Sequence, residues 1–240
     1  MKLTDINIVL SHTSHPGNIG ATARAMKTMG LSKLVLINPK NYPSHEATIR
    51  ASRADDILGA AKVVDNLDKA LAESHMVVGT SARQRRHDAP LLTPAQLATK
   101  IAEQPCQQIS LLFGTENSGL TNEELSRCHY QVFIPANPEY SSLNLASAVQ
   151  LIAYEIRMKF LEVSDTEALP ESQHDLVTSE QMEGFYGQII NTMLATGYYD
   201  PKHPKQLELR LRRMFNRLNP DSSEYQILRG FLTSIEKKIG

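Results

Sequence analysis

The sequence contains no tryptophan, and aromatic residues make up only 6% of its 240 residues. This scarcity argues against a ligand cage built from aromatic rings. Only two cysteines occur, Cys106 and Cys128, which excludes a disulfide framework and favours a reduced, cytoplasmic protein. Neither has a close cysteine partner, and no histidine pair stands at ligand spacing, so we expect no bound metal.

An excess of one charge is also missing, because 25 lysine and arginine residues stand against 26 aspartate and glutamate residues. The net charge of -1 excludes a uniformly basic nucleic-acid coat but allows a local basic face. No apolar run approaches the roughly 20 residues of a membrane-spanning helix. Asp5 interrupts the N-terminus early, which argues against a signal peptide. We therefore expect no membrane partner.

Short apolar runs alternate with helical patterns over the first two-thirds of the chain. The expected strands cover residues 6–10, 34–37, 63–64, 76–78, 110–113 and 132–134. The expected helices cover residues 19–29, 44–59, 67–72, 94–104, 121–128 and 143–161. Strands that are apolar throughout and alternate with helices indicate an α/β fold, with a parallel sheet covered by helices on both faces.

An acidic stretch follows this α/β part. Residues 163–176 contain four carboxylates, one proline and neither lysine nor arginine, a composition typical of a solvated linker. Three helical patterns come next, at residues 178–195, 204–218 and 222–238. We predict an α/β domain over residues 1–162, a linker over 163–176 and a small all-helical domain over 177–240.

Two glycine-containing stretches follow predicted strands in the first third of the chain, where α/β folds bind ligands. Residues 17–24 include Asn18, expected to cap the helix, and Arg24; an ordinary cap with a surface arginine is the alternative. Residues 79–82 are small and lead into Arg83, Arg85 and Arg86, which form either a phosphate-binding loop or a solvated run of charges.

Two further stretches follow later strands. Residues 113–120 place Glu116 between two glycines, but they lack the glycine spacing of dinucleotide-binding folds and the lysine of a phosphate-binding loop. Neither a nicotinamide nor an ATP site is therefore supported, and a tight turn with an exposed Glu116 is the alternative. Residues 134–144 form a proline-containing loop, after which Ser141 and Ser142 are expected to cap a long helix.

The order of three of these motifs resembles a known family. N-x-G-x-x-x-R at 18–24, F-G-x-E-x-x-G-L at 113–120 and I-P followed by S-S-L-N-L over 134–145 are similar to the signatures of the SPOUT RNA methyltransferases. The resemblance covers residues 6–160. The helical extension fits a subfamily that methylates the ribose 2′-hydroxyl of cytidine or uridine at position 32 of the tRNA anticodon loop.

The resemblance implies S-adenosylmethionine as cofactor and a deep trefoil knot at the C-terminal side of the sheet. The knot would comprise residues 80–82, 112–119 and 134–143, whose backbone groups would bind a bent cofactor. The implied cofactor-binding residues are Thr80, Ser81, Ala82, Gly114, Gly119, Ile134, Ser141, Ser142 and Leu143.

The resemblance also assigns catalytic positions. Arg24 matches an arginine proposed to assist deprotonation of the 2′-hydroxyl. Because arginine is normally protonated, we expect it to stabilise the developing alkoxide or to anchor a phosphate. Asn18, Glu116, Ser142 and Asn144 match supporting polar positions, with Ser142 orienting the nucleophile and Glu116 holding Asn18 or Arg24.

A tRNA substrate requires basic contacts. Arg83, Arg85 and Arg86 lie beside the predicted pocket in sequence, and Arg210, Arg213 and Arg217 share one helix face at intervals of three and four residues. A solvated helix surface is the alternative for the second group.

Family members are homodimers, so Arg24 is expected to reach the partner's site. The apolar stripe in the long helix would pack either at a dimer seam or in the internal core; it comprises Leu145, Val149, Ile152, Ile156 and Phe160.

Three other functions compete with a tRNA 2′-O-methyltransferase. The first is an enzyme of the same superfamily that acts on ribosomal RNA, which only the resemblance to a particular subfamily distinguishes from a tRNA enzyme. A non-catalytic RNA-binding protein is disfavoured, because Arg24, Glu116, Ser142 and Asn144 are all present. A nucleotide-binding dehydrogenase lacks its glycine fingerprint.

Overall fold

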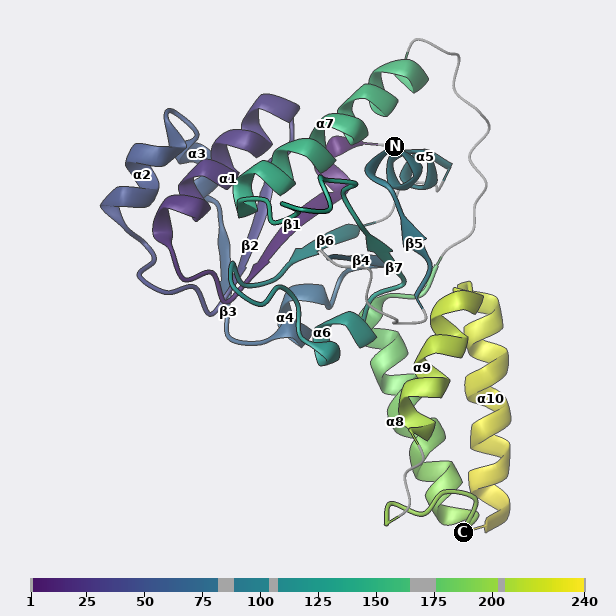
Figure 1. The fold of residues 1–240 in the computed structure, drawn as a ribbon. Helices are drawn as coiled ribbons and strands as arrows, with labels where there is room; N and C mark the ends of the chain where they lie inside the picture. The colour runs from purple at the N-terminus through teal and green to yellow at the C-terminus, as the bar shows by residue number, and fades with distance from the viewer. Residues whose placement is uncertain (1, 82–88, 104–107, 165–175, 203–205, 240) are drawn as a thin grey trace.

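The computed structural model describes residues 2–81, 89–103, 108–164, 176–202 and 206–239. At its centre is a seven-stranded sheet with the order β3-β2-β1-β6-β4-β7-β5, and every neighbouring pair is parallel (Figure 1). The strands are β1 (Ile6–Ser11), β2 (Lys33–Ile37), β3 (Lys62–Val64), β4 (Met76–Thr80), β5 (Leu91–Leu92), β6 (Ile109–Phe113) and β7 (Tyr130–Val132). The predicted α/β fold is confirmed.

Helices cover both faces of the sheet (Figure 1). One face carries α1 (Pro16–Met29), α2 (His45–Ala51), α3 (Asp55–Gly59), α5 (Pro94–Glu103) and α7 (Leu145–Ser164), and the other carries α4 (Leu67–Leu71) and α6 (Asn122–Ser126). Neighbouring residues of β1 serve different cores, because Ile8 packs under the first group and Val9 under the second. This double burial explains why β1 is apolar at almost every position.

Three helices form a separate cluster below α4 and α6 (Figure 1). They are α8 (Ser179–Ala195), α9 (Leu207–Leu218) and α10 (Ser222–Ile239). Phe185 is almost fully buried at their centre, and the ring of Phe215 meets it edge-on with 4.7 Å between centroids. The cluster therefore has a hydrophobic core of its own.

Two secondary-structure predictions were wrong. The expected helix over 44–59 is two helices, α2 and α3, because Ser52 and Arg53 have φ angles of +46° and +75° and turn the chain between them. The two-residue strand β5 was not predicted, because two apolar residues are too short a run to indicate a strand. It follows the segment 82–88, which lies outside the described residues.

The caps of α1 and α7 also differ from the predictions. The His15 ring accepts a hydrogen bond from the Gly17 N–H at 3.3 Å, so Asn18 lies inside α1 and does not cap it. Asn144 caps α7 in place of the two serines, since its Oδ1 accepts from the Ala146 N–H at 3.0 Å. The side chains of Asn18 and Ser142 are thus not used as helix caps.

The apolar stripe of α7 belongs to the core. Leu145, Val149, Ile152 and Ile156 are buried against the sheet and its neighbouring helices, and Phe160 is half-buried beside them. The alternative that placed this stripe at a dimer seam was therefore wrong. The outer face of α7 instead exposes Leu151, Tyr154 and Leu161, each by more than 40%.

Candidate active site

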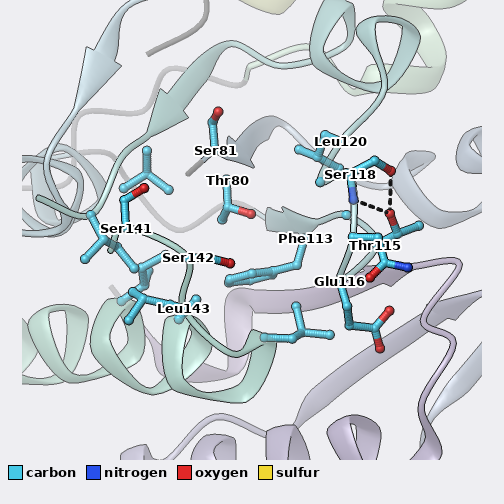
Figure 2. A pocket seen from close by; sticks show the side chains of 18 of the residues that line it. Thr80, Ser81, Phe113, Thr115, Glu116, Ser118, Leu120, Ser141, Ser142 and Leu143 are labelled. Carbon is cyan, nitrogen blue, oxygen red and sulfur yellow. Dashed lines mark hydrogen bonds between the residues drawn. The ribbon is translucent and has the colours of Figure 1, made fainter. Parts of the chain in front are cut away.

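A cavity of about 470 Å³ opens at the carboxyl ends of β4, β6 and β7 (Figure 2). In an open parallel sheet this edge is where ligands bind, and the volume is typical of a cofactor site. Three segments far apart in the sequence provide most of the lining: 80–81 after β4, 113–120 after β6 and 141–145 before α7.

The cavity collects most of the predicted cofactor residues. Its lining includes Thr80, Ser81, Gly114, Gly119, Ile134, Ser141, Ser142 and Leu143. Ala82 lies outside the described residues. Sequence reasoning missed Phe113, Leu120 and Leu125, which add apolar surface to the wall. The position of Phe113, as the last residue of a predicted strand and the first of a motif, was a signal that could have found it.

The loop between β6 and α6 folds back on itself. The Gly119 N–H donates to the Thr115 carbonyl at 2.9 Å, and the hydroxyls of Thr115 and Ser118 lie 2.7 Å apart (Figure 2). A Cβ added to Gly114 would stand 2.1 Å from the carbonyl carbon of Gly119. Only glycine therefore fits at position 114, and main-chain groups form this part of the cavity wall.

Glu116 ties the three sequence motifs together. Its carboxylate accepts hydrogen bonds from the Ser14 N–H at 3.1 Å, the Ser14 hydroxyl at 3.0 Å, the His15 N–H at 3.2 Å and the Asn18 amide at 3.0 Å. The Asn144 amide donates in turn to Asn18 Oδ1 at 2.9 Å. Of the two partners expected for Glu116, the structure places Asn18 there, and it adds Ser14 and His15, which the sequence analysis did not propose.

These hydrogen bonds determine the ionisation of Glu116. Partial burial alone would raise the pKa of its carboxyl group, but the donors from Asn18 and from backbone N–H groups, including those of Ser14 and His15, outweigh burial and lower the pKa to about 2. Glu116 is therefore a carboxylate at neutral pH. It acts as an acceptor that orients Asn18, and it is a poor candidate for a general base.

The lowered pKa of Glu116 predicts a pH dependence of stability. Its usual pKa is 4.5, so the charged form stabilises the fold fully above that pH, and the contribution shrinks as the pH falls toward about 2. We expect the difference in free energy of unfolding between the parent and Glu116→Gln to narrow between about pH 6 and about pH 3 in urea titrations. Glu73→Gln, which removes an exposed carboxylate, is the control; a difference that stays constant contradicts the prediction.

Arg24 lies outside this arrangement. It is exposed on α1, and it does not line the cavity. Its side chain has no hydrogen-bond or ion-pair partner among the described residues. Within one chain the structure therefore brings Asn18, Glu116, Ser142 and Asn144 together and leaves Arg24 apart from them.

The predicted RNA-binding arginines fall into two groups. Arg83, Arg85 and Arg86 lie outside the described residues. Arg210, Arg213 and Arg217 lie on α9, where their spacing places them within one face, called here the α9 basic face. Arg213 and Arg217 also line a small groove between α9 and the α/β domain, together with Pro90 and His129.

Two expected absences concern metals and membranes. Across the described ranges, no three histidine, cysteine, aspartate or glutamate side chains gather where they could hold a metal ion. In the same part of the chain, no helix combines the length and the apolar character needed to cross a bilayer.

Comparison with known proteins separates the chain into two matched regions. Residues 5–154 match the SpoU rRNA Methylase family, and residues 180–240 match the C-terminal domain of the tRNA methyltransferase TrmJ. The tRNA (cytidine/uridine-2′-O-)-methyltransferase TrmJ of Klebsiella pneumoniae is 50% identical over 240 residues, covering 98% of each chain.

Solved structures show the same similarity. The crystal structure of TrmJ from Z. mobilis ZM4 aligns with a TM-score of 0.84 and 32% identity, over 96% of this chain and 98% of that one. The SpoU methyltransferase AviRb from Streptomyces viridochromogenes, in complex with the cofactor AdoMet, aligns with a TM-score of 0.53 over 65% of this chain and 60% of that one. At 22% identity, the second match establishes the fold alone.

Proposed function

Because this chain belongs to the SpoU rRNA methylase family, we propose that it transfers a methyl group from S-adenosylmethionine to a ribose 2′-hydroxyl of tRNA. The observation that carries this proposal is the joining of three motifs around one cavity by Glu116, Asn18 and Asn144. The chain is 50% identical, over nearly its full length, to a relative named as a tRNA methyltransferase, and its C-terminal helices match the same kind of protein. This similarity favours tRNA as the substrate over ribosomal RNA.

The residues around the cavity fit the cofactor. S-adenosylmethionine, when bound, supplies a methyl group activated by its positive sulfonium. The side chains of Ile134 and Leu143 offer apolar walls for an adenine ring, and Thr80 and Ser141 offer hydroxyl groups for polar contacts. The absence of a side chain at Gly114 lets the main chain of Gly119 and Leu120 pack directly against it, so backbone groups of this loop are available to contact the cofactor.

The acceptor hydroxyl is a poor nucleophile, so alignment with the donor provides much of the rate enhancement. We assign Ser142, which is exposed at the cavity, to orienting the acceptor. Asn18 and Asn144 hold the first and third motifs in register beside it, and Glu116 fixes Asn18. We assign Arg24 to stabilising the charge that develops on the 2′-oxygen.

The separation of Arg24 from the cavity supports a homodimer. An arginine without a partner in the described part of its own chain can complete the cavity of a second copy. The outer face of α7 exposes Leu151, Tyr154 and Leu161, an apolar surface suited to such a contact. We propose that two chains associate through this face and exchange Arg24.

Three finer features complete the proposal. We propose the division into residues 1–162, 163–176 and 177–240, and a trefoil knot around the cavity, as the family resemblance implies. A cytoplasmic location suits a tRNA substrate. It also suits Cys128, whose burial raises the pKa of its thiol to about 12 and keeps it unreactive.

A labelled transfer assay tests the activity. The enzyme, S-adenosylmethionine with a labelled methyl group and unmodified tRNA transcripts should give a ribose methyl at position 32. A transcript with a 2′-deoxyribose at position 32 should accept none, whereas the same change at position 34 should leave transfer intact. Transfer to ribosomal RNA alone would favour the alternative function, and tight cofactor binding without transfer to any RNA would favour a non-catalytic RNA-binding protein.

The α9 basic face predicts a loss of tRNA affinity. In the double variant Arg210→Gln/Arg217→Gln, we expect tRNA to bind at least about tenfold more weakly. The slope of log affinity against log salt should become shallower by about 1.5, because two phosphate contacts are lost. Lys237→Gln/Lys238→Gln, on α10, removes the same charge and is the control. Equal affinities for the two double variants would contradict this role of α9.

A further inference from the structure

An ionic network joins the C-terminal helices to the α/β domain. Arg127, directly after α6, donates from Nη1 to Asp68 of α4 at 2.7 Å, and its Nε lies 2.9 Å from the carboxylate of Glu183 on α8. Arg212 on α9 holds the same carboxylate with two hydrogen bonds of 2.5 and 2.7 Å. The Arg127 side chain is only 11% exposed and that of Glu183 28%, so solvent screens this pair less than a surface pair, whereas Asp68 is 73% exposed and its contact is screened more.

Uncharged contacts reinforce the junction on either side. The Ser179 N–H, at the start of α8, donates to the Ser74 carbonyl at 2.7 Å. The Asn216 amide of α9 donates to the Cys128 carbonyl at 3.2 Å. The helices are therefore held at separate points, in the segments that follow α4 and α6, which restricts both their translation and their rotation.

The short helix α6 lies between this junction and the cofactor cavity. Leu125 lines the cavity on one side and the groove below α9 on the other. Glu124 accepts a buried hydrogen bond from the Ser11 hydroxyl of β1, and Thr121 caps the helix directly after the loop that forms the cavity wall. The Leu125 side chain thus borders both the cavity and the groove that Arg213 and Arg217 line.

We propose that Arg127 is a positioning residue, which through Asp68 and Glu183 holds the α9 basic face at a fixed distance and angle from the cofactor cavity and so aligns bound tRNA with the methyl donor. Misplacement of the reacting groups by about 1 Å can slow a reaction about a hundredfold. The inference rests on the proposed function, because it assumes that α9 contacts tRNA.

The test compares full-length enzymes with Arg127→Met and Arg127→Lys. Methionine keeps much of the apolar volume and removes the charge. We expect it to raise the KM for tRNA about tenfold and to lower kcat about tenfold, with the dissociation constant of S-adenosylmethionine within about threefold of the parent value. Lysine, which can still pair with one carboxylate, should restore part of both parameters.

A matched control is Arg229→Met on α10. Arg229 donates to the Gly184 carbonyl at 3.0 Å and lies over the Tyr225 ring, and both of these contacts are within the helical cluster. Its substitution should leave the kinetics for tRNA close to those of the parent. If Arg127→Met does not fold, Glu183→Gln weakens the same network from the C-terminal side.

A distance measurement separates positioning from general destabilisation. Spin labels on Arg50→Cys of α2 and Lys238→Cys of α10, in a Cys106→Ser variant diluted with excess unlabelled enzyme so that a dimer contains one labelled chain, should give a narrow distance distribution. This distribution should broaden with Arg127→Met and stay narrow with Arg229→Met. Parent kinetics despite a broadened distribution would overturn the proposal, and so would an unchanged distribution. Failure of the parent enzyme to methylate tRNA would instead overturn the proposed function, before any variant is compared.

Discussion

The Arg24→Ala enzyme should transfer methyl groups about 10²–10³ times more slowly than the parent, which is the usual cost of removing a charge stabiliser from a transition state. Arg24 lies outside the cavity of its own chain, so its loss should leave the dissociation constant of S-adenosylmethionine within a few-fold of the parent value. Single-turnover rates and calorimetric titration measure the two quantities separately.

Two controls sharpen this expectation. Arg50→Ala removes an exposed arginine from the neighbouring helix α2 and should not slow transfer. Mixing Arg24→Ala with an enzyme that is inactive through Ser142→Ala should restore part of the activity if Arg24 completes the partner's site, because mixed dimers then contain one intact site. Parent turnover by Arg24→Ala alone would remove Arg24 from the mechanism.

Gly114→Ala should weaken cofactor binding by up to about a hundredfold. The new methyl group would lie 2.1 Å from the carbonyl carbon of Gly119 and 2.3 Å from the amide nitrogen of Leu120, both main-chain atoms that cannot rotate away. Overpacking of this kind costs about 1–3 kcal/mol. The loop relieves this strain by moving away from the geometry that binds the cofactor. If the full cost of about 3 kcal/mol is lost from binding, the affinity for S-adenosylmethionine falls about a hundredfold, which titration measures.

The control for Gly114→Ala is Gly59→Ala. A Cβ at Gly59 meets nothing within 4 Å, so this variant should bind the cofactor as the parent does and should fold normally. Parent affinity in Gly114→Ala would show that the loop rearranges freely, and it would contradict the assignment of this loop to the cofactor site.

The central strands were predictable because burial on both faces leaves a simple pattern, whereas β5 was missed and the strand expected over 132–134 lies at Tyr130–Val132. Residues 6–10 and 109–113 are apolar at nearly every position, and the structure places both in the middle of the sheet. The division of residues 44–59 into two helices was not predictable, since neither glycine nor proline marks the turn at Ser52 and Arg53. Left-handed backbone at such residues is set by the packing of the flanking helices rather than by local preference.

Only part of the site could be predicted from the sequence. The resemblance to the family motifs pointed to Asn18, Glu116 and Asn144, whose side chains form hydrogen bonds across about a hundred positions of the chain. The contributions of Ser14 and His15 are largely main-chain N–H groups, which any residue type can supply, so no sequence pattern reveals them. The link between Arg127 and Glu183 joins the part around the sheet to the helical cluster, and residue spacing carries no information on such a contact.

The position of β1 in the sheet has a consequence for biosynthesis. β1 pairs with β2 on one side and with β6 on the other, and Asn7 of β1 bonds Ser110 of β6 across 103 positions of the chain. At translation rates of about 5–20 residues per second, β6 leaves the ribosome roughly 5–20 seconds after β1. During that interval β1, apolar on both faces, has one open edge. The nascent chain therefore passes through an aggregation-prone intermediate that exposes an unpaired apolar strand. Slower elongation would lengthen the time during which this strand can aggregate or bind chaperones.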